Sequence, residues 1–378
     1  MERSTQRILT THTGSLPRPD DLVAMLYAAD RGELPDHAAF ASRVAEATRE
    51  IVRKQIEVGV DVINDGEMGK VGYSTYVTGR LTGYEGAVNV PRRPRLEAAD
   101  FPEWDARSTS QRGSIRVRRL ACTGPIRYVG QEAVQRDIAT LKAALEGVHP
   151  AEAFMTAASP GVIAVFQPNQ FYPSTGDYLM ALADAMKEEY EAIHRAGFLL
   201  QVDCPDFTGL SAMDKPGIPP DLPLRVEALN RAVANIPADR MRLHLCWGNY
   251  EGPHHTDVPL KAILPEVLKA KPMGISFEGA NPRHEHEWNV FESLKLPEDK
   301  VIIPGVLDST TNYIENPELV AQRIVRYARV VGRERVIAGS DCGFGTFAGT
   351  PIVDPKVVLA KLQAMAEGAR LASRELWS

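Results

Sequence analysis

The sequence has 378 residues, of which 44% are hydrophobic and 24% are charged, and its formal net charge is -6. This composition is ordinary for a globular enzyme, and the negative charge argues against a nucleic-acid-binding surface. No apolar stretch approaches the roughly 18 residues that a membrane span needs, and the N-terminus lacks the apolar core of a signal peptide. We therefore expect a cytoplasmic protein with no nucleic-acid or membrane partner. Four cysteines are too few for a disulfide framework in so long a chain, which leaves metal binding or catalysis open.

Strand-like and helix-like segments alternate along the chain. Apolar, β-rich pieces occur at 8–11, 60–64, 119–122, 162–166, 198–202, 241–245, 273–277, 301–306 and 335–338. Amphipathic helical stretches lie between most of them, including 178–196, 259–270, 317–331 and 354–372. Repeated strand–helix units predict a parallel sheet, and eight of them close into a (β/α)8 TIM barrel. We predict one such α/β barrel domain over residues 1–378.

One candidate strand is too many for eight. The piece at 119–122 follows a long segment rich in proline and arginine, 86–113, which does not resemble a crossover helix. We therefore exclude it from the barrel and assign an insertion near residues 86–130.

Polar clusters follow nearly every predicted strand. In chain order they read HTGSLPRP, NDGEMGK, FQPNQFY, QVDCPDF, HLCWGNY, FEGANPRHEHEW, GVLDSTTNY and SDCGFGTF. Helix caps or turns would explain each one alone. In a barrel, however, the C-terminal ends of all strands lie on one face, where the loops build the active site. Together the clusters predict one polar pocket.

Four residues of these clusters form a possible metal site. Alternation at period two places His244 and Cys246 on the same side of their strand. Imidazole nitrogen and thiolate sulfur are both zinc donors, although a lone His and Cys on a buried strand are more often core residues. Glu278 and Cys342, near the ends of two later strands, supply a third and a fourth donor.

Zinc held by these four groups would favour attack by sulfur on carbon. Coordination to zinc deprotonates a thiol, which is mostly protonated and a poorer nucleophile at neutral pH. Two thiolates, a carboxylate and an imidazole would leave the site with a net charge near -1, so a bound substrate sulfur stays electron-rich. The same charge makes the site a poor activator of water.

Seven of the clusters, in this order and over almost the whole chain, resemble the catalytic barrel of the cobalamin-independent methionine synthase family and its short single-barrel relatives. The matching segments are HTGSLPRP, DGEMGK, QVDCPD, HLCWGNY, FEGAN, GVLDS and SDCGFGT. The resemblance implies a (β/α)8 barrel with a zinc ion that binds and activates the acceptor thiol. It assigns the zinc ligands to His244, Cys246, Glu278 and Cys342. It also implies that two carboxylates hold the amino group of homocysteine, Glu67 in DGE and Asp203 in QVD, which could otherwise be salt-bridged or capping groups.

Two departures from the family pattern bear on the alkyl donor. Full-length members, which also carry an N-terminal barrel not included here, place a histidine after the aspartate of the seventh strand's ending. This sequence reads Asp308-Ser309-Thr310 there, so an acid for protonating the departing folate nitrogen is missing. Phe166 also stands where a tryptophan is expected to stack on the pterin. We therefore expect a donor other than folate, such as a methylated small molecule or a corrinoid, which a partner protein could carry.

Three further residues are candidates for roles in the pocket. His12, at the end of the first strand, is a candidate for handling a proton or positioning substrate. Asp308 is a second candidate catalytic group. Trp247 is expected to wall the substrate site and keep water from the zinc thiolate.

Several functions are compatible with these residues. The first is zinc-dependent methyl transfer to a homocysteine-like thiol, which Glu67 and Asp203 favour. The second is that of epoxyalkane:coenzyme M transferases, in which a zinc-bound thiolate opens an epoxide. Its sulfonate acceptor would require cations, for which Arg18, Lys70 and Arg283 are the candidates. The third is a metal-free lyase of the uroporphyrinogen decarboxylase type, or a non-catalytic zinc-holding barrel.

Overall fold

The computed structural model describes residues 1–84, 96–111, 120–209, 217–350 and 352–378. Within these ranges the strands are β1 (Leu9–Thr10), β2 (Val62–Ile63), β3 (Glu152–Ala158), β4 (Leu199–Asp203), β5 (Met241–His244), β6 (Gly274–Phe277), β7 (Val301–Leu307) and β8 (Ile337–Ser340). The helices are α1 (Asp20–Asp30), α2 (His37–Glu57), α3 (Pro102–Gln111), α4 (Gln131–Ala144), α5 (Pro160–Phe166), α6 (Thr175–Arg195), α7 (Leu222–Ala232), α8 (Leu260–Val267), α9 (Val290–Ser293), α10 (Pro317–Val331) and α11 (Pro355–Leu376).

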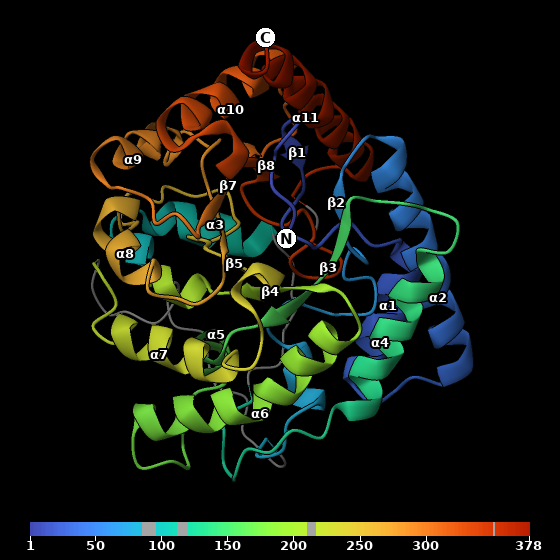
Figure 1. Cartoon of the computed structure of the whole chain (residues 1–378). Coiled ribbons are helices and arrows are strands. Elements are labelled where there is room, and N and C mark those ends of the chain that lie inside the picture. Colours follow the sequence, from blue (N-terminus) through green and yellow to red (C-terminus); the bar gives the residue numbers. More distant parts are fainter. Residues whose placement is uncertain (85–95, 112–119, 210–216, 351) are drawn as a thin grey trace.

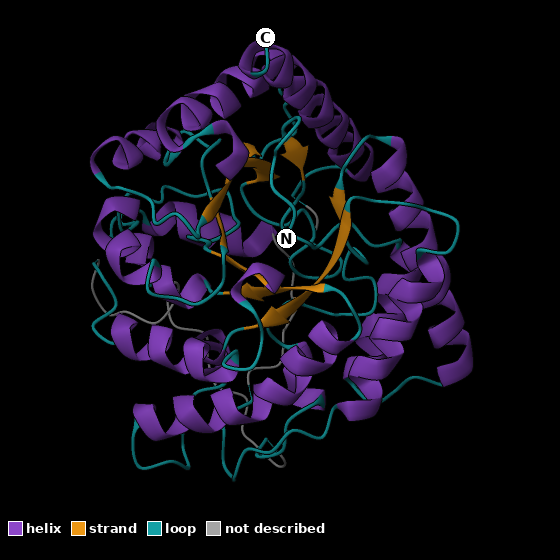
Figure 2. Ribbon diagram, in the orientation of Figure 1, coloured by secondary structure: helices purple, strands orange, loops and turns teal. Residues whose placement is uncertain are grey.

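The strands form a barrel. They lie in the order β1-β8-β7-β6-β5-β4-β3-β2, and each neighbouring pair is parallel. A parallel bridge between Thr11 and Val62 joins β1 to β2 and closes the circle. Figure 1 looks along the barrel, and Figure 2 shows the strands at its centre with helices around them. This confirms the predicted (β/α)8 fold.

One predicted strand is wrong. Residues 162–166 belong to α5, and the third strand is β3, which comes earlier in the chain. A short apolar run fits a buried strand and a buried helix equally well. The helix begins here because the Ser159 hydroxyl accepts from the backbone N–H of Val162 at 3.0 Å, and Pro160 occupies the first turn. The cluster FQPNQFY therefore follows a helix and not a strand.

Residues 120–122, the described part of the candidate strand at 119–122, are not among the eight barrel strands, as predicted. Cys122 forms an isolated parallel bridge with Asn169. The insertion predicted near 86–130 contains α3 and a short 3-10 helix at Leu96–Ala98. Its residues 86–95 and 112–119 lie outside the described part of the chain.

The interior of the barrel contains a buried charge. Arg242 on β5 is 2% exposed, and its guanidinium donates to Gln201 Oε1, Thr11 Oγ1 and the carbonyl of His12, each at 2.8 Å. It also lies 3.6 Å from the centroid of the Phe154 ring. Burying a guanidinium is costly unless its donors are bonded. Arg242 meets that condition by tying β5 to β1 and β4.

None of the helices in the described ranges is both long and apolar enough to span a membrane.

Candidate metal and acceptor site

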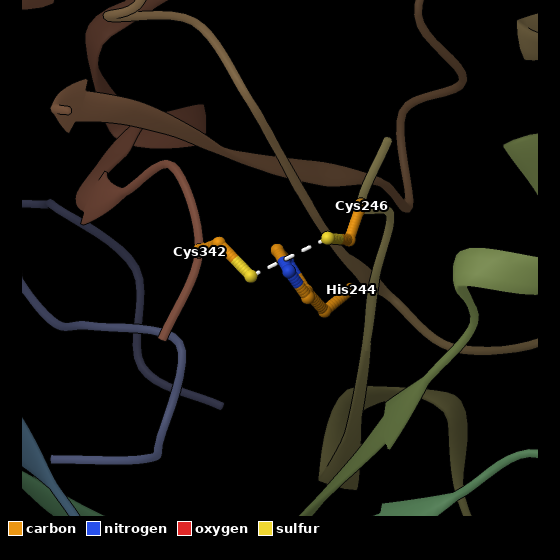
Figure 3. A group of neighbouring side chains, drawn as sticks. All are labelled: His244, Cys246 and Cys342. Carbon is orange, nitrogen blue, oxygen red and sulfur yellow. Dashed lines mark hydrogen bonds between the residues drawn. The ribbon is translucent and has the colours of Figure 1, made fainter. Parts of the chain in front are cut away.

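Three of the four predicted metal ligands meet at the C-terminal ends of the strands. His244 ends β5, Cys246 follows two residues later, and Cys342 follows two residues after β8. Their donor atoms all lie within 4.8 Å of one another, and the two sulfurs are 3.4 Å apart. Figure 3 shows the imidazole directed toward the space between the sulfurs. All three side chains are buried.

The donor atoms in this group fit a zinc ion. His244 Nδ1 lies 3.2 Å from Ser276 Oγ, whereas the buried Nε2 has no hydrogen-bond partner among the described residues. A buried polar atom without a partner is costly, and a metal would satisfy it. Burial and the charge of Arg242 lower the pKa of His244 to about 3, so its ring is neutral and can coordinate. Zinc–sulfur bonds of about 2.3 Å in a tetrahedral site place two sulfurs about 3.8 Å apart, close to the observed separation.

The fourth predicted ligand, Glu278, follows β6 and is not part of this group. Its Oε1 accepts from the backbone N–H of Trp247 at 2.8 Å. Its Oε2 accepts from Asn281 Nδ2 at 2.8 Å and from Arg283 Nη2 at 2.6 Å. The carboxylate is still a neighbour of the thiols. The pKa of Cys342 is raised by its hydrogen bond with Cys246, by burial, and also by the charges of Cys246 and Glu278.

Asp341, which precedes Cys342, was not identified from the sequence. Its Oδ1 accepts from the N–H groups of Gly279 and Ala280, and its Oδ2 accepts from the backbone N–H of Asn281, all at 2.8 Å. Burial, and then the charge of Glu278, raise its pKa to about 7. Asp341 therefore holds the loop that carries Glu278. Gly305 of β7 leaves space for it, because a Cβ there would lie 1.9 Å from Asp341 Oδ1.

The two carboxylates predicted to bind the acceptor are buried near one another. Thr156 Oγ1 donates to Glu67 Oε1 at 2.8 Å, and Gln201 Nε2 donates to Asp203 Oδ1 at 2.8 Å. Glu67 Oε2 has no hydrogen-bond partner among the described residues, although Arg18 lies 3.6 Å away. Burial, and then the charge of Glu67, raise the pKa of Asp203 to about 8. An ammonium group beside this pair would relieve the repulsion between the two carboxylates.

The register of the sheet places these carboxylates beside the metal donors. Asp203 is the partner of His244 in the pairing of β4 with β5. Glu67 adopts a left-handed backbone conformation with φ of 57°, which few residues other than glycine adopt. The surrounding contacts hold it in that conformation and direct its carboxylate inward.

Tyr73 links the two parts of the site and was also not identified from the sequence. Burial raises its pKa, and the charges of Cys246, Cys342 and Asp203 raise it further. The phenol thus lies near both the thiols and the carboxylate of Asp203. Its ring centroid lies 5.9 Å from that of Phe166 and 5.6 Å from that of Phe347, so Phe166 contributes to an aromatic group next to the site.

His12 is held by contacts within the protein. Its Nε2 lies 2.7 Å from Gln55 Oε1, and its Nδ1 accepts from the backbone N–H of Gly14 at 3.2 Å. Burial lowers its pKa to about 4. Both ring nitrogens are therefore engaged away from the metal donors. A proton-handling role for His12 remains a prediction.

Asp308 and Trp247 also have defined partners. Asp308 Oδ1 accepts from the backbone N–H and the hydroxyl of Thr310, each at 2.8 Å, and so closes a turn after β7. Trp247 Nε1 donates to the carbonyl of Val258 at 2.7 Å, and the Trp247 ring lies 4.3 Å from the ring of His284. These contacts fix Trp247 beside the metal donors. The catalytic role of Asp308 and the substrate contact of Trp247 remain predictions.

The three cations considered for a sulfonate acceptor are already bound by protein groups. Lys70 Nζ donates to the carbonyl of Thr156 at 2.6 Å, and Arg18 Nε donates to the carbonyl of Glu67 at 3.0 Å. Arg283 forms ion pairs with Glu278 and Asp257. A sulfonate would have to compete with these partners, although Arg18 Nη2 has no hydrogen-bond partner among the described residues and lies 3.6 Å from Glu67 Oε2.

A second group of possible ligands lies farther out, at Glu97, His254 and Asp257. Asp257 there accepts from Arg283 and lies 3.2 Å from His284 Nε2. Burial lowers the pKa of His284, but hydrogen bonds to Asp257 and Glu287 raise it to about 9. Two cations thus already neutralise this group, which is a structural ion network.

Comparison with known proteins agrees with this geometry. The model of the family described as "Cobalamin-independent synthase, Catalytic domain" matches residues 161–370, more than half of the chain. The chain belongs to this family. The resemblance to cobalamin-independent methionine synthases is thereby confirmed, and the match supports an enzyme that transfers a methyl or alkyl group to a thiol.

Individual relatives match the chain over most of its length. A methionine synthase of Thermococcus kodakarensis is 24% identical over 370 residues, covering 97% of this chain and 94% of the relative. A 2-hydroxypropyl-CoM lyase of Xanthobacter autotrophicus is 25% identical over 405 residues, covering 98% and 96%. The structure of a B12-independent methionine synthase from Shewanella sp. W3-18-1 superposes with a TM-score of 0.71 at 18% identity, covering 98% of this chain and 99% of the other. The superposition shows the shared fold.

Proposed function

We propose that this protein is a zinc-dependent thiol alkyltransferase that methylates a homocysteine-like thiol from a donor other than folate. The observation that carries the proposal is the meeting of the His244 imidazole with the sulfurs of Cys246 and Cys342, beside the buried pair Glu67 and Asp203. A three-donor group beside two carboxylates suits an acceptor with a thiol and an ammonium group. Both substrates would be small molecules, although a corrinoid donor could be carried by a protein.

The residues of the chain divide the work between them. His244, Cys246 and Cys342 would hold the zinc, with Glu278 as the predicted fourth ligand, and zinc would supply a deprotonated acceptor thiol at neutral pH. Glu67 and Asp203 would bind the acceptor's ammonium group and so fix the direction in which its sulfur points. Ser276 orients His244, and Trp247 excludes water on one side. The sulfur then attacks the donor's methyl carbon, the carbon–sulfur bond forms, and the leaving group departs with the bonding electrons.

A second candidate function is the opening of an epoxide by coenzyme M. The relative named 2-hydroxypropyl-CoM lyase favours it. The engagement of Arg18, Lys70 and Arg283 by protein acceptors argues for the amino-acid acceptor instead.

The first test is metal content. We expect the purified protein to hold about one zinc per chain, and Cys246→Ala and Cys342→Ser to lose most of it, because each removes a donor. Cys122→Ala and Cys204→Ala are the matched controls, since these buried thiols lie outside the donor group, and both should keep the metal. Full zinc in both ligand variants would reject the site. Turnover by metal-free protein would instead favour a lyase of the uroporphyrinogen decarboxylase type.

The second arm of the test identifies the substrates. Zinc-loaded protein is given homocysteine or coenzyme M with a methylcorrinoid, an epoxide or methyltetrahydrofolate, and thioether formation is followed by mass. General-acid assistance typically supplies about 10² to 10⁴ in rate, and Thr310 stands where that acid is expected. We therefore expect methyltetrahydrofolate to be the slower donor. If it is the fastest, another residue protonates the leaving nitrogen, and His12 would be examined first.

A further inference from the structure

We propose that Tyr73, Phe166 and Phe347 bind the alkyl donor, and that this donor is an onium compound, a small sulfonium or quaternary ammonium ion with its methyl group on a positively charged atom. These three residues, called the aromatic triad below, come from the loop after β2, the end of α5 and the loop after β8. The inference rests on the proposed function and names the donor class for the same thiol.

The rings of the aromatic triad are inclined walls and not a parallel stack. Their centroids lie 5.9 Å apart for Tyr73 and Phe166, 5.6 Å for Tyr73 and Phe347, and 6.3 Å for Phe166 and Phe347. The ring planes meet at 82°, 58° and 45° in the same order, and all three side chains are partly exposed. A cation seated above a triangle of this size can lie within about 5 Å of every centroid, inside the roughly 6 Å range of a cation–π interaction.

A short antiparallel link between the loops after β2 and β8 fixes two of the rings. The backbone N–H of Ala348 donates to the carbonyl of Val71 at 2.9 Å, and Gly72 and Phe347 form a bridge beside it. Gly72 allows this close approach, because a Cβ there would lie 2.5 Å from Phe347 Cδ1. Tyr73 follows at once in the chain. These two rings are thus held in place before any ligand binds, which lowers the ordering cost of binding.

The aromatic triad lies beside the thiols. Burial raises the pKa of Tyr73, and the negative charges of Cys246, Cys342 and Asp203 raise it further, because these groups lie near its hydroxyl. Phe347 belongs to the loop that carries Cys342. Two cysteine thiolates and the thiolate of the acceptor together outweigh the charge of a zinc ion, so the surroundings stay negative in the proposed complex. A cationic donor would be drawn to this place with its methyl carbon next to the acceptor sulfur.

An onium donor also suits the presence of Thr310 where an acid is expected. The acceptor thiolate forms a bond to the methyl carbon, and the bond from that carbon to the positive sulfur or nitrogen breaks. The bonding electrons stay with the leaving atom, which departs as a neutral thioether or amine and needs no proton. The folate nitrogen and the oxygen of an opened epoxide each need one. A methylcorrinoid needs none either, but its methyl group is not on a small cation that the aromatic triad could bind.

The test is binding of tetramethylammonium to the full chain, measured by ligand-observed NMR and compared with tert-butanol, a neutral molecule of similar size. Tetramethylammonium should bind about tenfold more tightly or better. Phe166→Leu and Phe347→Leu should each weaken its binding by about 2- to 30-fold, the range of a cation–π contact, and should leave tert-butanol unaffected, since leucine is apolar but has no π face. Tyr73→Phe keeps the ring and should keep the affinity. Phe171→Leu removes an exposed ring outside the aromatic triad and is the matched control.

Turnover distinguishes the two kinds of onium donor. Zinc-loaded protein with homocysteine is given trimethylsulfonium, tetramethylammonium or a methylcorrinoid, and methionine formation is followed by mass. We expect trimethylsulfonium to be the fastest, because a neutral thioether is a better leaving group than a neutral amine. Phe347→Leu should raise the KM for trimethylsulfonium and leave that for the methylcorrinoid within about twofold, since only the cation depends on a π face.

Two results would overturn the inference. One is tetramethylammonium that binds wild-type protein no more tightly than tert-butanol, a comparison that does not depend on how well any variant folds. The other is a methylcorrinoid that acts faster than both onium donors. Failure of the proposed function itself has a different signature, namely no thioether from any donor while tetramethylammonium still binds and still depends on the rings.

Discussion

Asp203 ends β4 and pairs with His244 of β5. Its environment and its proposed role favour opposite protonation states. Burial and the nearby charge of Glu67 favour the protonated form, with a pKa of about 8, whereas binding an ammonium group requires the carboxylate. The acceptor would therefore bind with release of a proton at neutral pH. Protonation of Asp203 in the free protein would avoid two adjacent buried negative charges. In the complex, the positive charge of the ammonium group would compensate the two carboxylates.

We expect Asp203→Asn to weaken homocysteine binding by about 1.5 to 3 kcal/mol, the range for hydrogen bonds to charged groups. Zinc affinity should stay unchanged, because Asp203 is not among the donors. Homocysteine affinity of the wild type should also rise from pH 6 toward pH 8 as Asp203 loses its proton, and this part of the rise should be missing in the variant. Titration calorimetry at several pH values measures both. An unchanged affinity in the variant would favour the sulfonate-bearing acceptor.

Residues with a local signature could be predicted from the sequence, and residues defined by distant neighbours could not. His244 and Cys246 stand two apart on one strand, so period-two alternation places them together. Tyr73 and Asp341 matter because of groups far from them in the sequence. Asp341, for example, holds the loop after β6 by accepting from the N–H of Gly279, 62 residues earlier. The orientation of Glu278 depends on hydrogen bonds from Arg283 and Asn281. The positions of these residues in the sequence do not predict how their side chains are oriented.

At the level of elements, α5 shows how a boundary depends on packing. Its first turn passes so close to Asp206 that a Cβ on Gly161 would lie 1.9 Å from Asp206 Oδ2. That carboxylate also accepts from Ser159 Oγ at 2.6 Å and lies 3.7 Å from Arg225. Residues 162–166, which were predicted as a strand from their apolar pattern, are thus held in a helix by contacts with the loop after β4. The hydrophobic periodicity of the segment itself does not predict these contacts.

Gly161→Ala should therefore destabilise the protein by about 1 to 3 kcal/mol, the usual cost of overpacking a buried site. Gly176→Ala is the matched control near the start of α6, where the nearest atoms to a new Cβ lie 3.6 and 3.7 Å away. This substitution should be neutral or slightly stabilising, because alanine lowers the conformational entropy of the unfolded chain. Urea unfolding of both variants tests the comparison. Equal stability of the two would contradict the close contact at α5.

The barrel architecture could be predicted because most strand–helix units have a recognisable hydrophobic pattern of their own. The alternation of strands and helices does not, however, predict which side chains fill the interior of the barrel. Arg242 joins β5 to β1 across the interior, and β1 and β2 are short strands whose junction is a single bridge. An arginine between the apolar residues Met241 and Leu243 is visible in the sequence. Its partners Gln201 and Thr11, however, lie 41 and 231 residues away in the chain.

Arg242→Met should lower the free energy of unfolding by about 2 kcal/mol or more, because it leaves buried acceptors on β1 and β4 without donors. Arg240→Met is the control. Arg240 pairs with Glu152 at 3.2 Å at a partly exposed position, where a salt bridge is worth about 0 to 1 kcal/mol. Urea midpoints and slopes give both values. A loss no larger for Arg242 than for Arg240 would show that the interior tolerates an apolar replacement.

The closure of the barrel between β8 and β1 has a consequence for how the protein forms during synthesis. The first strand pairs with the last, Leu9 with Ile337, so its hydrogen bonds must wait until almost the whole chain has left the ribosome. Cys342 lies two residues after the end of β8, which makes it the last residue of the three-donor group to be translated. Zinc binding by the complete group, as proposed, would therefore coincide with the final closure of the sheet. Nascent chains stalled before β8 should bind neither zinc nor acceptor, however long they wait.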